Sequence, residues 1–251
     1  MHGVIEGAFF TDRREEVRRI RTALTEPGSK LLVYGPRRMG KTSAILRALS
    51  GIRGKGAAAI LADLSTASTP ADMGNRILTA AARALGRRWK DFITDLATRL
   101  QVSLSLTPDP GSGIILPSLD VSLRGRPEPE QRNALTGVLD ALNQMAVERG
   151  TTLWIALDEF QEIHRFGGRD AEWDLRATLQ RHTAVGYVLA GSREHIIQRM
   201  ILSKGALYRR VDKLAFGPMD PAHLARWIDR RMTDHSVPSS GPGRRLSLIH
   251  I

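Results

Sequence analysis

Hydrophobic residues along the chain follow two spacings that predict a sheet flanked by helices. Short apolar runs with few charges are typical of strands buried in a parallel sheet, and they occur at 30–34, 57–64, 152–157 and 186–190. Stretches with apolar residues at helical spacing lie between these runs, near 17–24, 42–49, 70–85 and 128–149. This alternation predicts an α/β fold with a mostly parallel sheet and helices on both faces.

Residues 101–124 break the alternation. Apolar and polar residues alternate at 102–106 and again at 119–123, with a Pro- and Gly-rich segment between the two stretches. This pattern predicts a β-hairpin inserted into the α/β fold. We favour a structural flap over the neighbouring helices; the alternative is a surface that contacts a partner.

The apolar run at 30–34 is followed by a glycine-rich segment that is typical of phosphate-binding loops. It has the spacing G-x-x-x-x-G-K-[ST], in which glycines let successive backbone N–H groups surround one phosphate anion. The lysine reaches the β- and γ-phosphates, the hydroxyl ligates Mg²⁺, and the following helix adds its N-terminal N–H groups. The predicted ATP-binding residues are Gly35, Pro36, Arg37, Arg38, Met39, Gly40, Lys41, Thr42 and Ser43.

An acidic pair follows the apolar run at 152–157. A doubly wound sheet places its chemistry at the carboxyl ends of its strands, so Asp158 is predicted to hold Mg²⁺ together with Thr42. Glu159 is predicted to polarise the water that attacks the γ-phosphate. The alternatives for this pair are a helix cap and a solvent-facing acidic turn.

Two further side chains are predicted to face the γ-phosphate. Ser192 follows the run at 186–190 and is placed to hydrogen-bond the γ-phosphate or the attacking water; otherwise it is a turn residue. Arg210 is the candidate for a guanidinium that stabilises the charge developing in phosphoryl transfer, with Arg209 and Arg193 as alternates. Near the start of the chain, Arg13 is a candidate to flank the base, or it belongs to a simple surface helix.

Composition narrows the class of protein. The 251-residue sequence has a net charge of +11, spread along the chain, which indicates either DNA contact or solvated arginines on helix faces. It has no cysteine, which excludes disulfides, Cys-ligated zinc and thiol catalysis, and its seven histidines lack metal-ligand spacing. We find no signal peptide and no apolar run of membrane-spanning length, so we expect a cytoplasmic protein without membrane contact.

Several segments together resemble a known family. The segments at 35–42, 153–163, 188–200, 205–210 and 214–219 resemble, in that order, the archaeal-type ATPases, of the STAND branch of AAA+-like P-loop ATPases. The resemblance extends over 9–232 and implies ATP and Mg²⁺ at the loop, with hydrolysis coupled to a conformational switch. On the family pattern Arg210 matches the family's arginine, but Arg209 stands where the family tends to have Gly.

The resemblance also suggests a domain organisation. We expect a P-loop ATPase core at 1–216, with the hairpin insertion at about 101–124, and a partial helical lid at 217–245 that begins at Asp220-Pro221. The last residues, 246–251, back-translate to a transposon-end adapter of sequencing libraries, so we expect a C-terminally truncated chain without its downstream effector domain.

The sequence therefore predicts Mg²⁺-dependent ATP hydrolysis. Two other functions stay open: a nucleotide-gated signalling switch with little turnover, and a DNA-binding ATPase of the initiator or loader type. A homo-oligomer is compatible with either function.

Overall fold

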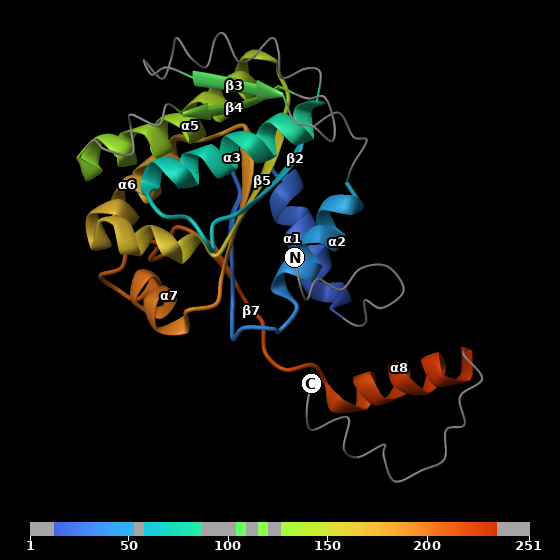
Figure 1. The fold of residues 1–251 in the computed structure, drawn as a ribbon. Helices are drawn as coiled ribbons and strands as arrows, with labels where there is room; N and C mark the ends of the chain where they lie inside the picture. Colours follow the sequence, from blue (N-terminus) through green and yellow to red (C-terminus); the bar gives the residue numbers. More distant parts are fainter. Residues whose placement is uncertain (1–12, 53–57, 87–103, 109–114, 120–126, 235–251) are drawn as a thin grey trace.

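A computed structural model describes residues 13–52, 58–86, 104–108, 115–119 and 127–234, and their core is a five-stranded parallel sheet (Figure 1). The strand order is β2-β5-β6-β1-β7, and every pairing in this sheet is parallel. The strands are β1 (Lys30–Tyr34), β2 (Ala59–Asp63), β5 (Leu153–Asp158), β6 (Val185–Gly191) and β7 (Asp212–Ala215). The predicted α/β fold with a parallel sheet is confirmed.

Helices cover both faces of the sheet (Figure 1). The first face is covered by α1 (Arg14–Thr25) and α2 (Lys41–Ser50). The other face is covered by α3 (Pro70–Leu85), α5 (Glu128–Glu148), α6 (Gly168–Arg181), α7 (Glu194–Ile201) and the 3₁₀ helix η4 (Phe160–Phe166). The last helix, α8 (Pro221–Asp234), extends away from the sheet beyond β7.

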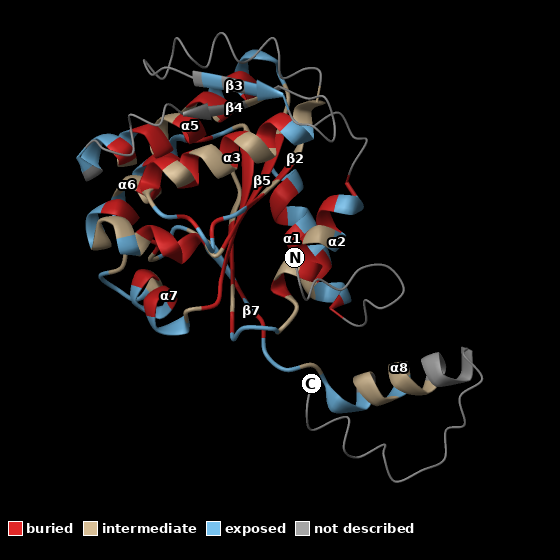
Figure 2. Cartoon of the chain, viewed as in Figure 1, coloured by how far each residue is buried: buried red, intermediate tan, exposed pale blue. Residues whose placement is uncertain are grey.

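The period-two alternation of the strands divides the apolar core into two halves. On β1, Leu31 and Val33 belong to the half of the core that contains α1 and α2, whereas Leu32 belongs to the half that contains α3, α5, α6 and α7. On β6, Val188 joins the first half and Leu189 the second. All residues of β5 and β6 are buried, as Figure 2 shows for the centre of the sheet. This explains why the sequence of these strands is almost continuously apolar.

The two edges of the core differ from the centre. β2 is an edge strand, but Ile60 and Ala62 are buried on the side of α3, so it is not exposed on both faces. The predicted hairpin is present as β3 (Leu104–Pro108) and β4 (Ile115–Leu119), which pair antiparallel and pack against α3. This packing favours the structural flap over a free surface.

Local capping signals explain where two helices begin. The Thr69 side chain accepts a hydrogen bond from the Asp72 N–H at 3.1 Å, with Pro70 in the first turn of α3. The Asp220 side chain accepts from the Ala222 N–H at 3.0 Å, at the start of α8. For α1, the N-cap residue is Arg13, whose backbone is in the left-handed region. Thr11 and Asp12, which the sequence offers as cap residues for this helix, lie outside the described residues.

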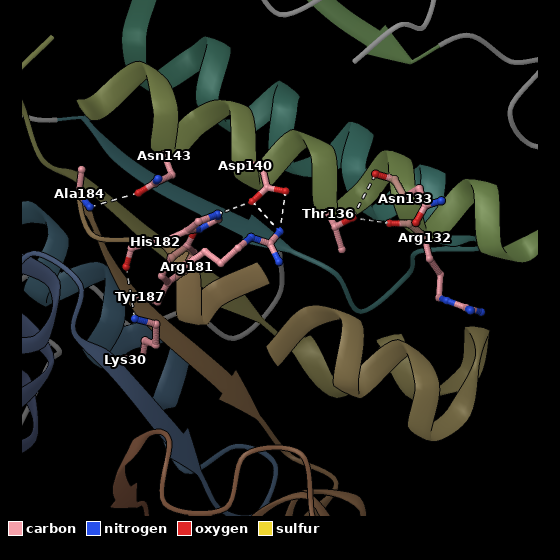
Figure 3. A network of polar contacts seen from close by, with 10 residues as sticks. All are labelled: Lys30, Arg132, Asn133, Thr136, Asp140, Asn143, Arg181, His182, Ala184 and Tyr187. Atoms are coloured by element: carbon pink, nitrogen blue, oxygen red, sulfur yellow. Dashed lines mark hydrogen bonds and ion pairs between the residues drawn. The ribbon is translucent and has the colours of Figure 1, made fainter. Parts of the chain in front are cut away.

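A polar network joins α5 to β6 at the amino ends of the strands (Figure 3). The His182 ring is almost fully buried, with Nδ1 2.7 Å from the Tyr187 hydroxyl and Nε2 2.8 Å from Asp140 Oδ1. Because a carboxylate can only accept, Nε2 carries the ring proton and Nδ1 accepts from Tyr187. Asp140 also binds Arg181, and Asn143 Oδ1 accepts from the Ala184 N–H. The network fixes α5 against the start of β6.

Candidate nucleotide site

The phosphate loop leaves the carboxyl end of β1 and enters α2 through backbone conformations that favour glycine. Gly35 has φ 149° and Gly40 has φ 85°, and Gly40 is the N-cap of α2. A Cβ at Gly35 would lie 2.1 Å from the Phe216 carbonyl oxygen, so the loop passes directly against the end of β7. Arg38 also has a positive φ, 63°. The chain is therefore shaped into a tight turn directly before a helix N-terminus, the arrangement that binds phosphate.

Lys41 fills the centre of this turn. Its Nζ donates to the carbonyl oxygens of Gly35 at 2.8 Å and Pro36 at 2.7 Å, and the residue is buried. Burial lowers the pKa of Lys41, while the nearby carboxylates of Glu159 and Asp158 act in the opposite direction. The ammonium group is thus held inside the loop, where the predicted phosphates would lie.

The two predicted metal ligands are in direct contact. Thr42 Oγ1 donates to Asp158 Oδ2 at 2.6 Å, although the residues are far apart in sequence. Burial raises the pKa of the Asp158 carboxyl, and the hydrogen bond from Thr42 opposes that shift. Hydroxyl and carboxylate oxygens are the hard donors that Mg²⁺ prefers, so this pair fits the ion. Among the described residues, no group of three His, Cys, Asp or Glu side chains forms a separate metal site.

The structure brings Glu159 and Ser192 together. The Ser192 hydroxyl donates to Glu159 Oε2 at 2.8 Å, joining the ends of β5 and β6 beside the loop. Gln161 Nε2 donates to the same oxygen, and Gln161 is fully buried. Arg37 Nε lies 3.5 Å from Ser192 Oγ, which connects the phosphate loop to this group. Glu159 itself has φ 53°, a conformation that is uncommon for non-glycine residues and is enriched at active sites.

The remaining loop residues divide by exposure. Pro36, Arg37 and Arg38 are exposed, and Met39 is half-buried. Ser43 is buried in the first turn of α2.

The expectation that Arg210 faces the nucleotide of its own chain is wrong. Asp212 pairs with Leu31 at the amino end of β1, so Arg210 lies at the edge of the sheet opposite to the phosphate loop. Arg209 and Arg210 line the same hollow as Gly28 and Lys30 there. Strand β1 alone separates this edge from the loop by about 13 Å, because a strand advances about 3.3 Å per residue. The sequence places Arg210 directly before a strand, and because that strand runs parallel to β1, Arg210 lies at the amino edge of the sheet.

The alternate Arg193 is on the correct edge but has another partner. It follows Ser192, and its guanidinium pairs with the buried Glu162 carboxylate at 2.9 Å. This ion pair anchors η4 to the start of α7 beside the site. Neither Gln161 nor Glu162 was predicted as a site residue; their position directly after the acidic pair was the available signal.

Arg13 has a connecting role that sequence reasoning missed. Its guanidinium donates to the Gly217 carbonyl and, at 3.4 Å, to the Met39 carbonyl of the phosphate loop. It also pairs with Glu16 at 2.9 Å and lies 5.0 Å from the centre of the Phe216 ring. Arg13 therefore ties three segments together: the start of α1, the phosphate loop, and the chain that leaves β7 toward α8.

Comparisons with solved structures agree with this fold. The chain is similar to the Walker-type ATPase PABY2304 of Pyrococcus abyssi, with a TM-score of 0.59 and 20% identity over 95% of this chain and 63% of that one. The fold is that of a P-loop NTPase. The Aeropyrum pernix ORC1 protein, solved in complex with DNA, matches with a TM-score of 0.54 and 18% identity over 91% of this chain and 51% of its own. The Aeropyrum pernix ORC2 protein, solved with ADPNP and ADP, gives 0.55 and 16% over 92% and 55%.

These similarities establish the fold alone, because the identities are low. The chain spans 63% or less of the length of each of these three proteins. No protein-family model matches the sequence, and no curated protein matches it. No helix in the described part of the chain has the length and apolar character needed to cross a bilayer.

Proposed function

We propose that this chain binds ATP with Mg²⁺ at the phosphate loop and hydrolyses it. The observation that carries the proposal is the 2.6 Å contact between Thr42 and Asp158, beside a lysine enclosed by its own loop. A hydroxyl after the lysine and a carboxylate from the end of another strand of the sheet are the two protein groups that a magnesium triphosphate requires. The fold shared with Walker-type and ORC proteins supports the same conclusion.

The residues around the loop would have separate roles in binding phosphate, Mg²⁺ and the attacking water. Backbone N–H groups from Arg37 to Lys41 and the α2 N-terminus would hold the phosphates, with Lys41 Nζ exchanging its carbonyl partners for phosphate oxygens. Thr42 and Asp158 would hold Mg²⁺, which neutralises charge on the β- and γ-phosphates. Glu159 would orient a water in line with the γ-phosphate and accept its proton, while Ser192 keeps Glu159 in place.

Arg210 could serve only the nucleotide of a second copy of the chain. It is exposed at the edge of the sheet opposite to its own phosphate loop. A guanidinium supplied across an interface stabilises the charge that develops in transfer, an effect worth about 10³–10⁵ in rate. We therefore include a homo-oligomer in the proposal, with turnover that rises with protein concentration.

The first experiment measures nucleotide binding and turnover separately. Lys41→Ala should abolish Mg²⁺-dependent binding of a fluorescent ATP analogue, whereas Lys213→Ala, an exposed lysine on β7, should bind normally. Glu159→Gln should bind ATP but lose steady-state phosphate release, with Glu148→Gln on the exposed end of α5 as its control. Hydrolysis by Glu159→Gln at the wild-type rate would remove Glu159 from the mechanism.

A second candidate function is a slow, nucleotide-gated switch of the STAND type. The observation in its favour is that Glu159 already accepts from both Ser192 and Gln161, so one oxygen of the candidate base is occupied. Under this alternative, ATP would bind tightly, and turnover would stay low until a partner or a second copy is added. A DNA-binding initiator-type ATPase is the third candidate, favoured by the net charge and by the similarity to a protein solved with DNA.

A further inference from the structure

A cavity of about 640 Å³ lies between α6 and the segment 203–210, away from the phosphate loop. Its lining contains five cationic side chains and two aromatic rings, and no carboxylate is among its lining residues in the described part of the chain. The cations are Arg169, Arg176, Lys204, Arg209 and Arg210, and the rings are Trp173 and Tyr208. The volume is in the range of small-molecule sites, and the charge selects an anion.

One face of α6 carries three of the side chains that line the cavity. Arg169, Trp173 and Arg176 are four and three residues apart, the spacing that places side chains on one helical face. The opposite face of α6 supplies the buried residues Ala171 and Leu175 to the core, whereas the first face supplies no residue to it. Trp173 is 40% exposed, although an indole ring gains free energy by leaving water.

Two contacts hold the aromatic rings beside the cations. The Arg176 guanidinium lies 4.5 Å from the centre of the Trp173 ring, and that of Arg209 lies 5.3 Å from the centre of Tyr208. Arg169 donates to the Lys204 carbonyl at 3.1 Å, which fastens α6 to the opposite wall of the cavity. The rings are therefore held at the cavity with guanidinium groups next to them.

The backbone at Arg209 adds a sign of function. Arg209 has φ 52°, in the left-handed region that glycine adopts without strain and an arginine does not. Backbone strain of this kind, here at the rim of a cationic cavity, is found repeatedly at ligand sites.

We propose that this cavity binds a nucleotide unit of a single-stranded nucleic acid, with a base stacked on Trp173 and phosphates paired with Arg169, Arg176 and Lys204. An exposed ring with cations beside it is the chemistry that holds unpaired bases and their backbone. A duplex offers phosphates but keeps its bases stacked inside, so it would not use Trp173. The proposal goes beyond ATP hydrolysis, because no residue of the phosphate loop lines the cavity.

The test measures binding of a short fluorescein-labelled oligothymidylate by anisotropy, without ATP and in the full chain carrying Lys41→Ala. Trp173→Ala should weaken binding about fivefold or more, and Trp173→Phe should restore much of it, since stacking on an aromatic ring carries the contact. Arg169→Ala and Arg176→Ala should each lower the slope of log affinity against log salt by about 0.7. Arg47→Ala, an exposed arginine on α2, is the control with the same change in net charge.

The result that supports the proposal is a loss confined to the cavity variants with retained circular dichroism and melting temperature. The proposal is overturned if Trp173→Ala and Arg176→Ala bind like Arg47→Ala, or if Trp173→Phe is as weak as Trp173→Ala. It is also overturned if duplex DNA binds equally tightly, or if thymidine monophosphate displaces the strand at equal nucleotide concentration. Because the ATP site is disabled in every variant, none of these results depends on the proposed hydrolysis.

Discussion

The two glycines of the phosphate loop allow a matched test of how the loop is built. Both have positive φ, but only Gly35 touches another segment: a Cβ there would lie 2.1 Å from the Phe216 carbonyl oxygen. A Cβ at Gly40 would have no neighbour within 4 Å. Gly40→Ala should therefore cost only the left-handed strain, about 1–2 kcal/mol of the free energy of unfolding.

Gly35→Ala should cost considerably more. It combines a backbone conformation that is nearly restricted to glycine, worth about 1–3 kcal/mol, with a backbone clash of the kind that overpacking introduces, about 1–3 kcal/mol or more. The two contributions add to roughly 2–6 kcal/mol of the free energy of unfolding. Phe216 cannot easily move away from the new methyl group, because its N–H donates to the Tyr34 carbonyl.

Urea denaturation of the ligand-free protein measures both variants. Tryptophan fluorescence, to which the buried Trp154 on β5 contributes, reports the loss of the core. We expect Gly35→Ala to unfold at a lower urea concentration than Gly40→Ala, and this order of the two midpoints tests the reasoning. If Gly40→Ala proved as destabilising as Gly35→Ala, the close approach of the loop to the end of β7 would not be what requires glycine at 35.

The other predictions concern the polar network and a helix cap. Tyr187→Phe should cost about 1–3 kcal/mol, because His182 Nδ1 loses its donor inside the core; a melting curve measures it. Burial lowers the pKa of His182 despite the opposing effect of Asp140. The unfolded chain therefore takes up a proton below about pH 6.5 before the native protein does, and stability should fall as the pH falls below that value. His182→Gln should flatten this fall in urea titrations at several pH values; an unchanged slope would contradict the assignment. Thr69→Ala should cost about 1 kcal/mol through the lost cap of α3, whereas Thr25→Ala at the exposed end of α1 should cost less.

The parallel sheet and the phosphate loop could be predicted because their signals are local. The apolar run at β1, the glycine spacing and the helical period of α2 lie within a single stretch of sequence. The contact between Thr42 and Asp158 was also predictable, since parallel strands bring their carboxyl ends to one edge. The cap of α3 is a local signal of the same kind, because Thr69 stands directly before Pro70 and accepts from the Asp72 N–H.

The position of Arg210 shows where prediction from local sequence fails. Arg210 precedes a strand, so its side chain starts from the amino edge, whereas the residues that follow strands lie at the other edge. The contact of Gln161 with Glu159 depends on a left-handed turn at Glu159, which no residue pattern indicated. The lid and the tail of the predicted organisation continue into 235–251, which lie outside the described residues.

The position of Arg13 has a mechanical consequence. One guanidinium is shared between a carbonyl of the phosphate loop and a carbonyl on the path to α8, with no flexible spacer between them. If an incoming triphosphate draws Met39 inward, the Arg13 guanidinium must follow it or give up one of its two carbonyl partners. When both bonds are kept, the segment that leads to α8 would move together with the phosphate loop. When one bond is lost, that segment would no longer be coupled to the loop.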